Sequence, residues 1–199
     1  MVQSIVIAGV GGQGTLLASK ILAAAAGAKG LFVRTSETIG MAQRGGSVSS
    51  HLRIEAKEVS PIIPTAHADI LLGFEPAEAV RMLPKLTPEA RCVVSTESIV
   101  PTNVALGKGL YLADEYINTI KKYYPTTVFI DGAALALKAG DLRTLNIILL
   151  GAASAAGALP FSEEEIRAAI KSCVRPKLFA MNEKAFALGL AAVSNRRWQ

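Results

Sequence analysis

Short apolar segments alternate with helical segments along most of the chain. The apolar segments carry the β-branched and aromatic residues typical of strands, and they cover residues 4–8, 31–35, 48–54, 68–74, 91–95 and 126–130. Segments of helical character cover residues 15–26, 76–83, 114–123, 166–171 and 176–193, and another helix follows Asp131. Strands that alternate with helices predict an α/β fold with an open, mostly parallel sheet and helices on both faces.

The length and the apolar content both bear on how the chain is organised. The chain has 199 residues, of which 51% are hydrophobic and only 19% are charged. This length suits one compact domain, which we expect at residues 1–194, followed by a short tail at residues 195–199. The surface of a small monomer normally carries more charge, so we expect part of the apolar surface to meet another chain.

Charge and cysteine content exclude several classes of function. The net charge of +5 is modest and the few aromatic residues do not interleave with basic ones, so we expect no nucleic-acid surface. No apolar stretch is long enough to span a bilayer, and we expect a cytoplasmic protein with no membrane segment. Cys92 and Cys173 stand far apart and neither belongs to a CxxC pair, so the ligands of a disulfide framework, a zinc site or an iron–sulfur cluster are missing.

A glycine-rich turn follows the first apolar segment and opens the first helix. Its candidate ligand-binding residues are Gly9, Gly11, Gly12, Gln13, Gly14 and Thr15. In such a turn, Gly9 permits the bend, Gly11 lets the backbone approach a ligand and Gly14 lets the helix lie close to the strand. The N-terminus of the helix then offers unpaired N–H groups to an anion. In the alternative interpretation, the glycines only permit close packing and no ligand binds.

The end of the second strand bears on whether the ligand is a dinucleotide. A dinucleotide-binding domain places an acid there to hold the ribose hydroxyls. Thr35 and Ser36 stand at this end, whereas Glu37 serves only if the strand runs longer, and Arg34 is not cleanly placed for a 2′-phosphate. The lack of a cleanly placed acid at this strand end disfavours an NAD(P) site, but it does not exclude one.

A second glycine-rich loop lies between the second and third strands. It contains Arg44 followed by Gly45 and Gly46. The glycines allow the main chain to approach another group closely, and the arginine supplies a fixed positive charge. We therefore add these three residues to the candidate cofactor-binding site. An ordinary turn with a solvated arginine remains the alternative.

These two loops, residues 9–14 and 37–48, carry a resemblance to a known family. They resemble the gamma-type subunits of the 2-oxoacid:ferredoxin oxidoreductases, and most of all the indolepyruvate ferredoxin oxidoreductase beta subunit. Residues 136–140 and 146–152 are also similar to the family, so the resemblance covers nearly the whole chain. It implies a single Rossmann-like three-layer domain. Two departures are Ile39, where the indolepyruvate group is expected to carry histidine, and Asp141, where many relatives carry asparagine.

The resemblance also implies an activity and its partners. Enzymes of this family decarboxylate a 2-oxoacid oxidatively with coenzyme A, giving an acyl-CoA, CO2 and reduced ferredoxin. In the indolepyruvate group a larger alpha subunit carries thiamine diphosphate and the iron–sulfur clusters. This chain then binds no cofactor alone, except for coenzyme A if its phosphates meet the first loop and Arg44. A stand-alone NAD(P)-dependent oxidoreductase and a ligand-free scaffold subunit remain the alternatives.

Overall fold

A computed structural model describes residues 3–37, 45–55 and 60–193. The strands are β1 (Gln3–Val10), β2 (Phe32–Glu37), β3 (Ser47–Glu55), β4 (Ala68–Gly73), β5 (Leu86–Ser95) and β6 (Val128–Ile130). The helices are α1 (Thr15–Ala28), α2 (Pro76–Met82), α3 (Thr102–Ala105), α4 (Ala113–Tyr123), α5 (Gly132–Ala139), α6 (Leu145–Ala155), α7 (Glu163–Cys173) and α8 (Phe179–Ala191). Short 3-10 turns form η2 (Leu83–Lys85), η3 (Leu142–Thr144) and η4 (Pro176–Leu178).

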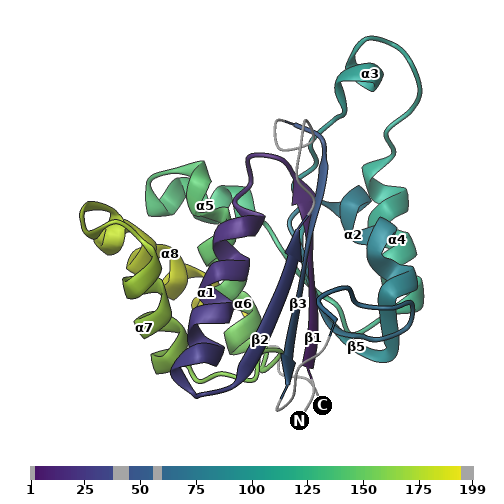
Figure 1. Cartoon of the computed structure of the whole chain (residues 1–199). Coiled ribbons are helices and arrows are strands. Elements are labelled where there is room, and N and C mark those ends of the chain that lie inside the picture. The colour runs from purple at the N-terminus through teal and green to yellow at the C-terminus, as the bar shows by residue number, and fades with distance from the viewer. Residues whose placement is uncertain (1–2, 38–44, 56–59, 194–199) are drawn as a thin grey trace.

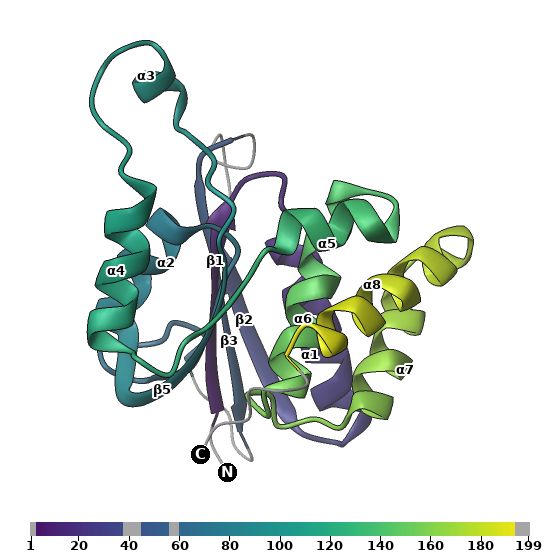
Figure 2. The ribbon, with the colours of Figure 1, turned by 180° about the vertical axis from the view of Figure 1, so that it is seen from behind.

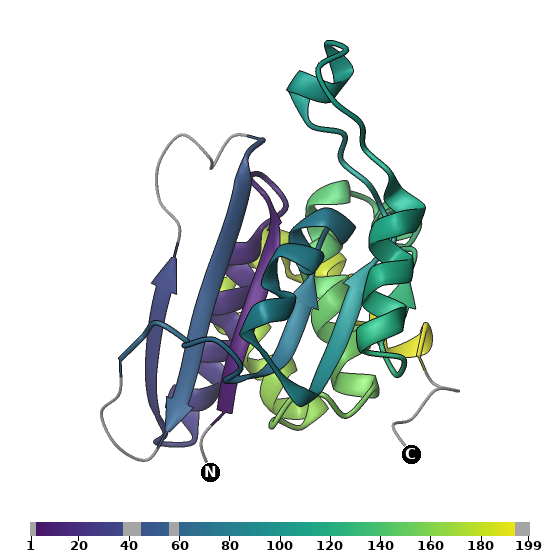
Figure 3. The same ribbon diagram turned by 90° about the vertical axis from the view of Figure 1, so that its right-hand side faces the viewer.

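The strands form one six-stranded sheet with the order β2-β3-β1-β4-β5-β6. β1, β4, β5 and β6 pair in parallel, whereas β3 is antiparallel to both of its neighbours, β1 and β2. Figure 3 shows β3 running against the direction of β1 and β2. The predicted α/β domain with an open, mostly parallel sheet is therefore confirmed. β3 lies between β1 and β2 in this sheet. In a dinucleotide-binding domain, the second strand of the chain lies directly next to the first.

Helices cover both faces of the sheet and produce three layers (Figure 1). One face packs against α1, α5, α6, α7 and α8, and the other face packs against α2 and α4, as the view from behind also shows (Figure 2). The side chains of β1 alternate between these layers, with Ile5 and Ile7 in the larger core and Val6 and Ala8 in the smaller one. β1 is therefore buried on both faces, as expected for the inner strand of a covered sheet.

A narrow projection leaves the body between β5 and α4. Residues 98–112, which we call the arm, extend beyond the edge at which the parallel strands end, and they carry α3 near the tip (Figures 1 and 3). The sequence shows only a mixture of glycine, proline and short apolar pieces here, so it does not predict a projection.

Candidate functional site

The glycine-rich turn lies at the carboxyl edge of the sheet, between β1 and α1. Gly12 and Gly14 have positive φ angles of 110° and 87°, which favour glycine. Gly14 caps α1 without a side-chain hydrogen bond, and the first turn of α1 contains no acidic residue. The helical ladder starts with bonds from the N–H groups of Leu17 and Ala18 to the carbonyl of Gly14. The N–H groups of Thr15 and Leu16 precede this ladder and carry the positive end of the helix dipole.

The side chain of Gln13 is buried under the turn and faces the protein. Its Oε1 accepts a hydrogen bond of 2.7 Å from the N–H of Val10, and its Nε2 donates one of 3.0 Å to the carbonyl of Phe74. The amide therefore ties the end of β1 to the end of β4. Of Gln13, only the main chain can therefore face a ligand.

Gly9 and Gly14 pack too tightly to carry a side chain. A Cβ on Gly9 would lie 2.8 Å from Oε1 of Gln13 and 2.9 Å from Cβ of Phe74. A Cβ on Gly14 would lie 2.7 Å from Nδ2 of Asn146 in α6. The missing side chain at Gly14 therefore lets α1 pack closely against α6. The sequence predicted close packing against β1 instead. At Gly12 a Cβ would meet open space, so its backbone is accessible from outside.

The two glycine-rich loops lie against each other. The N–H of Gly11 donates to the carbonyl of Gly46 at 2.8 Å, and the N–H of Gly45 donates to the carbonyl of Gly11 at 3.1 Å. These bonds continue the antiparallel β1–β3 ladder, in which Val10 lies opposite Ser47. The structure thus brings together the two loops that the sequence singled out, apart from Arg44, which lies outside the described residues together with Ile39.

A cavity of about 250 Å³ lies beside the turn. It is lined by the glycine turn, the start of α1 and the facing ends of β2 and β3, through Gly11, Gly12, Gly14, Thr15, Leu16, Glu37, Val48, Ser49 and Ser50. β2 runs as far as Glu37, so this carboxylate does reach the cavity wall. The volume is below the roughly 300–1,000 Å³ of complete small-molecule sites, so the cavity is too small to enclose a large ligand on its own.

Glu75 is a buried carboxyl group at the end of β4. It caps α2, as the sequence indicated, by accepting the N–H of Glu78 at 2.9 Å. The hydroxyl of Tyr111, from the arm, donates to its other oxygen. Burial raises the pKa of Glu75 above its ordinary value, although the bonds from Tyr111 and from the main chain act in the opposite direction. Burial and the bond to Glu75 also raise the pKa of Tyr111. Sequence reasoning missed Tyr111, because no local pattern links it to Glu75.

Further polar bonds connect this carboxyl group to the second loop. Ser47 Oγ donates to Oε2 of Glu78 at 2.5 Å, and Nε of Arg81 lies 3.4 Å from Oε1 of Glu78. Ser47 directly follows Gly46, which is bonded to Gly11. The base of the arm, the start of α2 and both glycine-rich loops therefore share one network at the carboxyl edge.

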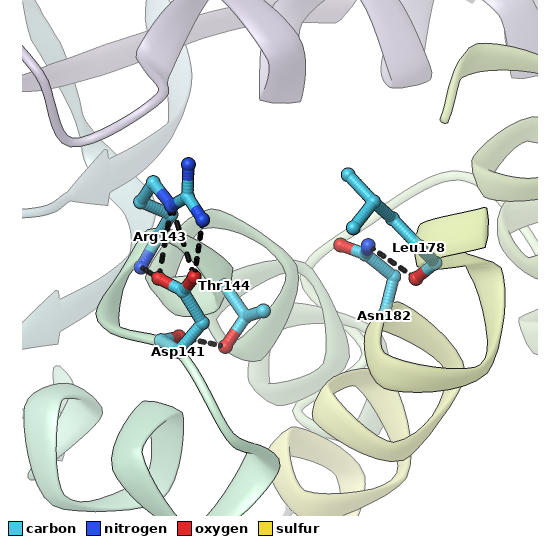
Figure 4. Close-up of polar contacts among 5 residues, drawn as sticks. All are labelled: Asp141, Arg143, Thr144, Leu178 and Asn182. Carbon is cyan, nitrogen blue, oxygen red and sulfur yellow. Dashed lines mark hydrogen bonds and ion pairs between the residues drawn. The ribbon is translucent and has the colours of Figure 1, made fainter. Parts of the chain in front are cut away.

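A second cavity, of about 260 Å³, lies on another side of α1. Its lining combines Leu17 with residues of η3, the end of α7 and the η4–α8 turn, among them Arg143 and Asn182. Figure 4 shows Arg143 folded back onto Asp141, with Nη2 and Oδ2 2.6 Å apart, and Asn182 bonded to the carbonyl of Leu178. The hydrogen bonds from Arg143 lower the pKa of Asp141 to about 2. This guanidinium is thus already paired with the carboxylate of Asp141, the residue that caps η3.

The part of the chain that the structure describes shows neither a cluster of metal ligands nor a membrane-spanning helix. Within residues 3–37, 45–55 and 60–193, no three His, Cys, Asp or Glu side chains lie in a group suited to a metal ion. Cys92 is buried, and burial raises its thiol pKa to about 12. None of the helices in these ranges is long and apolar enough to cross a bilayer.

Comparisons with known proteins give a consistent picture. The family model described as pyruvate ferredoxin/flavodoxin oxidoreductase matches residues 4–192. The indolepyruvate oxidoreductase subunit IorB of Archaeoglobus fulgidus is 38% identical over 195 residues, which are 97% of this chain and 96% of that protein.

Two solved structures share the fold along the whole chain. The gamma subunit of a keto/oxoacid ferredoxin oxidoreductase from Geobacter sulfurreducens superposes with a TM-score of 0.73 and 25% identity, covering 100% of this chain and 99% of that one. The 2-oxoglutarate:ferredoxin oxidoreductase of Magnetococcus marinus, solved with 2-oxoglutarate, coenzyme A and succinyl-CoA bound, gives a TM-score of 0.69 at 19% identity. This chain matches 33% of that longer chain.

Proposed function

The chain belongs to the pyruvate ferredoxin/flavodoxin oxidoreductase family, and we propose that it is the subunit without redox centres of an indolepyruvate-type enzyme. In the proposed reaction an aryl 2-oxoacid loses CO2, its acyl group passes to the thiol of coenzyme A, and two electrons pass to ferredoxin. The larger alpha subunit supplies thiamine diphosphate and the iron–sulfur clusters. The donor set of this chain agrees with that division, because it has two cysteines and a cluster needs about four.

The observation that carries the proposal is the pairing of the two glycine-rich loops. Gly11 is bonded to both Gly45 and Gly46, next to a helix N-terminus that no side chain caps. The N–H groups of Gly11 and Gly45 donate to carbonyls within these loops, so the pairing fixes the shape of the site. The N–H groups of Thr15 and Leu16 and the dipole of α1 are what favour a phosphate or carboxylate there. We propose that this surface forms one wall of the composite active site and receives an anionic group of coenzyme A, with Arg44 as the neighbouring cation. The chain alone is proposed to be inactive.

The proposed anion site is tested by placing a negative charge at its mouth. Leu16→Glu adds a carboxylate to the first turn of α1, on the cavity wall. Leu31→Glu is the matched control, because Leu31 is about as exposed but follows the other end of α1. In calorimetric titrations of the assembled complex, Leu16→Glu should weaken coenzyme A binding roughly tenfold or more, since a like charge nearby costs on the order of 1 to 3 kcal/mol. Equal affinities of Leu16→Glu and Leu31→Glu would exclude the site.

An NAD(P)-binding oxidoreductase is the second candidate, because Glu37 lies on the cavity wall where it could hold ribose hydroxyls. Against it stand the small cavity and the place of β3 between β1 and β2. Titration with NADH and NADPH beside coenzyme A separates the candidates. Binding of a nicotinamide cofactor alone would favour this second function, and binding of none of the three would favour a scaffold subunit.

A further inference from the structure

The arm carries exposed apolar side chains and almost no charge. Lys108 is the one charged residue in residues 98–112. Leu106 and Leu110 are 70% and 80% exposed, more than any other large apolar side chain of the described residues. They flank a turn at Gly107 and Gly109, both of which have positive φ angles. Exposed apolar side chains gathered on a projection mark a surface that another molecule covers.

Hydrogen bonds hold the arm in a defined shape. Pro101 O accepts from the N–H groups of Val104 and Ala105 at 2.9 and 3.0 Å, and the N–H of Lys108 donates to the carbonyl of Asn103 at 2.8 Å. At the base, the Tyr111 hydroxyl is bonded to the buried Glu75. A projection that is ordered before it binds loses less conformational entropy on docking than a flexible loop.

The base of the arm also belongs to the network that reaches the glycine-rich loops. Glu75 and Glu78 connect Tyr111 to Ser47, next to Gly46. The arm and the cavity therefore lie at the same edge of the sheet. This shared edge is the reason for which we take one partner to contact both. In the Magnetococcus marinus enzyme the matching fold is one third of a longer chain, so this fold occurs attached to much larger structure.

We infer that the arm is a docking element that inserts Leu106 and Leu110 into an apolar groove of the larger subunit. Lys108, between the two leucines, then meets an acidic side chain at the rim of that groove. The inference rests on the proposed function, because it takes the larger subunit as the partner. A second copy of this chain is the competing occupant, and the experiment separates the two.

The experiment measures association of the full chain with the larger subunit by biolayer interferometry. The arm variant is Leu106→Ser with Leu110→Ser. The matched control is Ile62→Ser with Tyr123→Ser, since these side chains are 58% and 63% exposed but lie in the loop before β4 and at the end of α4. The arm variant should lose affinity roughly 100-fold or more, as expected for two central anchor residues, and the control should bind like wild type. Both variants should unfold at the wild-type temperature.

A second variant tests the attachment of the arm. Tyr111→Phe keeps the ring against Tyr116, whose centroid lies 5.2 Å away, but removes the hydroxyl bonded to Glu75. It should weaken association a few-fold to about tenfold, the range for one hydrogen bond. An affinity of the double leucine variant equal to wild type overturns the inference on its own.

The remaining outcomes distinguish the two proposals. If wild type and control bind the larger subunit and the arm variant binds equally well, the docking inference is wrong and the proposed function stands. If no form binds the larger subunit, the proposed function is wrong and the inference falls with it. If light scattering shows that the isolated chain self-associates through Leu106 and Leu110, a second copy is the occupant and the inference is overturned.

Discussion

The buried carboxyl group of Glu75 should make the stability of the fold depend on pH. Burial raises its pKa, so the folded chain binds this proton more tightly than the unfolded chain does. Stability contributed by this group is therefore present at low pH, and it is lost as the pH rises from the unfolded pKa through the folded one. Glu75→Gln keeps an acceptor for the N–H of Glu78 and removes the titration. The stability of Glu75→Gln relative to wild type should thus increase between pH 4 and pH 7, measured by urea unfolding.

Glu165 provides a control of opposite sign. It completes the capping box of α7 with Ser162, and its bonds to Ser162 and Lys29 lower its pKa. Its contribution is present above the unfolded pKa and is lost as the pH falls through the folded pKa. Glu165→Gln should therefore lose stability relative to wild type over the same rise in pH. The same trend for both variants would contradict the assigned pKa direction of Glu75.

At the residue scale, the sequence predicted where the candidate site lies but not what its residues contact. The glycine spacing located the turn because that signal is local. The atoms that forbid a side chain at Gly14 belong to Asn146, and one of the atoms closest to a Cβ on Gly9 belongs to Phe74, both far along the chain. The inward direction of Gln13 likewise depends on the carbonyl of Phe74. Such partners are set by tertiary packing, which spacing within one segment does not reveal.

At the scale of elements, α6 and α8 cross at two glycines. A Cβ on Gly189 would lie 2.2 Å from the carbonyl oxygen of Ile148, and one on Gly151 would lie 2.4 Å from that of Phe186. Main-chain atoms do not move aside as a side chain does. Gly189→Ala should therefore lower the free energy of unfolding by about 3 kcal/mol or more, measured by urea unfolding followed by circular dichroism.

Gly27 in α1 is the matched control for that substitution. A Cβ there meets no atom within 4 Å, so Gly27→Ala should stabilise the helix by about 0.5–1 kcal/mol. A Gly189→Ala protein as stable as Gly27→Ala would show that the two helices can separate without cost.

The strands illustrate what an element pattern can and cannot predict. The alternation in residues 48–54 was enough to predict β3, and the apolar run in residues 68–74 predicted β4. The place of β3 between β1 and β2 was not predicted, because the pattern of one strand does not name its neighbours. The arm was missed for a related reason: its shape depends on turns and on Glu75, and not on a periodic pattern.

At the scale of the whole molecule, the isolated chain should lack both activity and redox centres. Its two cysteines do not meet the ligand requirement of a cluster, and the thiol of Cys92 is buried and protonated. The purified chain should therefore show no visible iron–sulfur absorption and no oxidation of indolepyruvate by a ferredoxin surrogate. Addition of the larger subunit is the control and should give activity. Turnover by this chain alone would contradict the subunit assignment.

The position of β1 also affects how the chain folds during synthesis. β1 is made before both of its neighbours, β3 and β4, and Gly73 follows Val10 by about 60 residues. At roughly 5–20 residues per second, ribosomes need about 3–12 s to complete β4 after β1. For that time a strand that ends up buried on both faces has no parallel partner to pair with. The central strand of the finished sheet is thus a segment of the nascent chain that depends on protection from aggregation until β4 has been made.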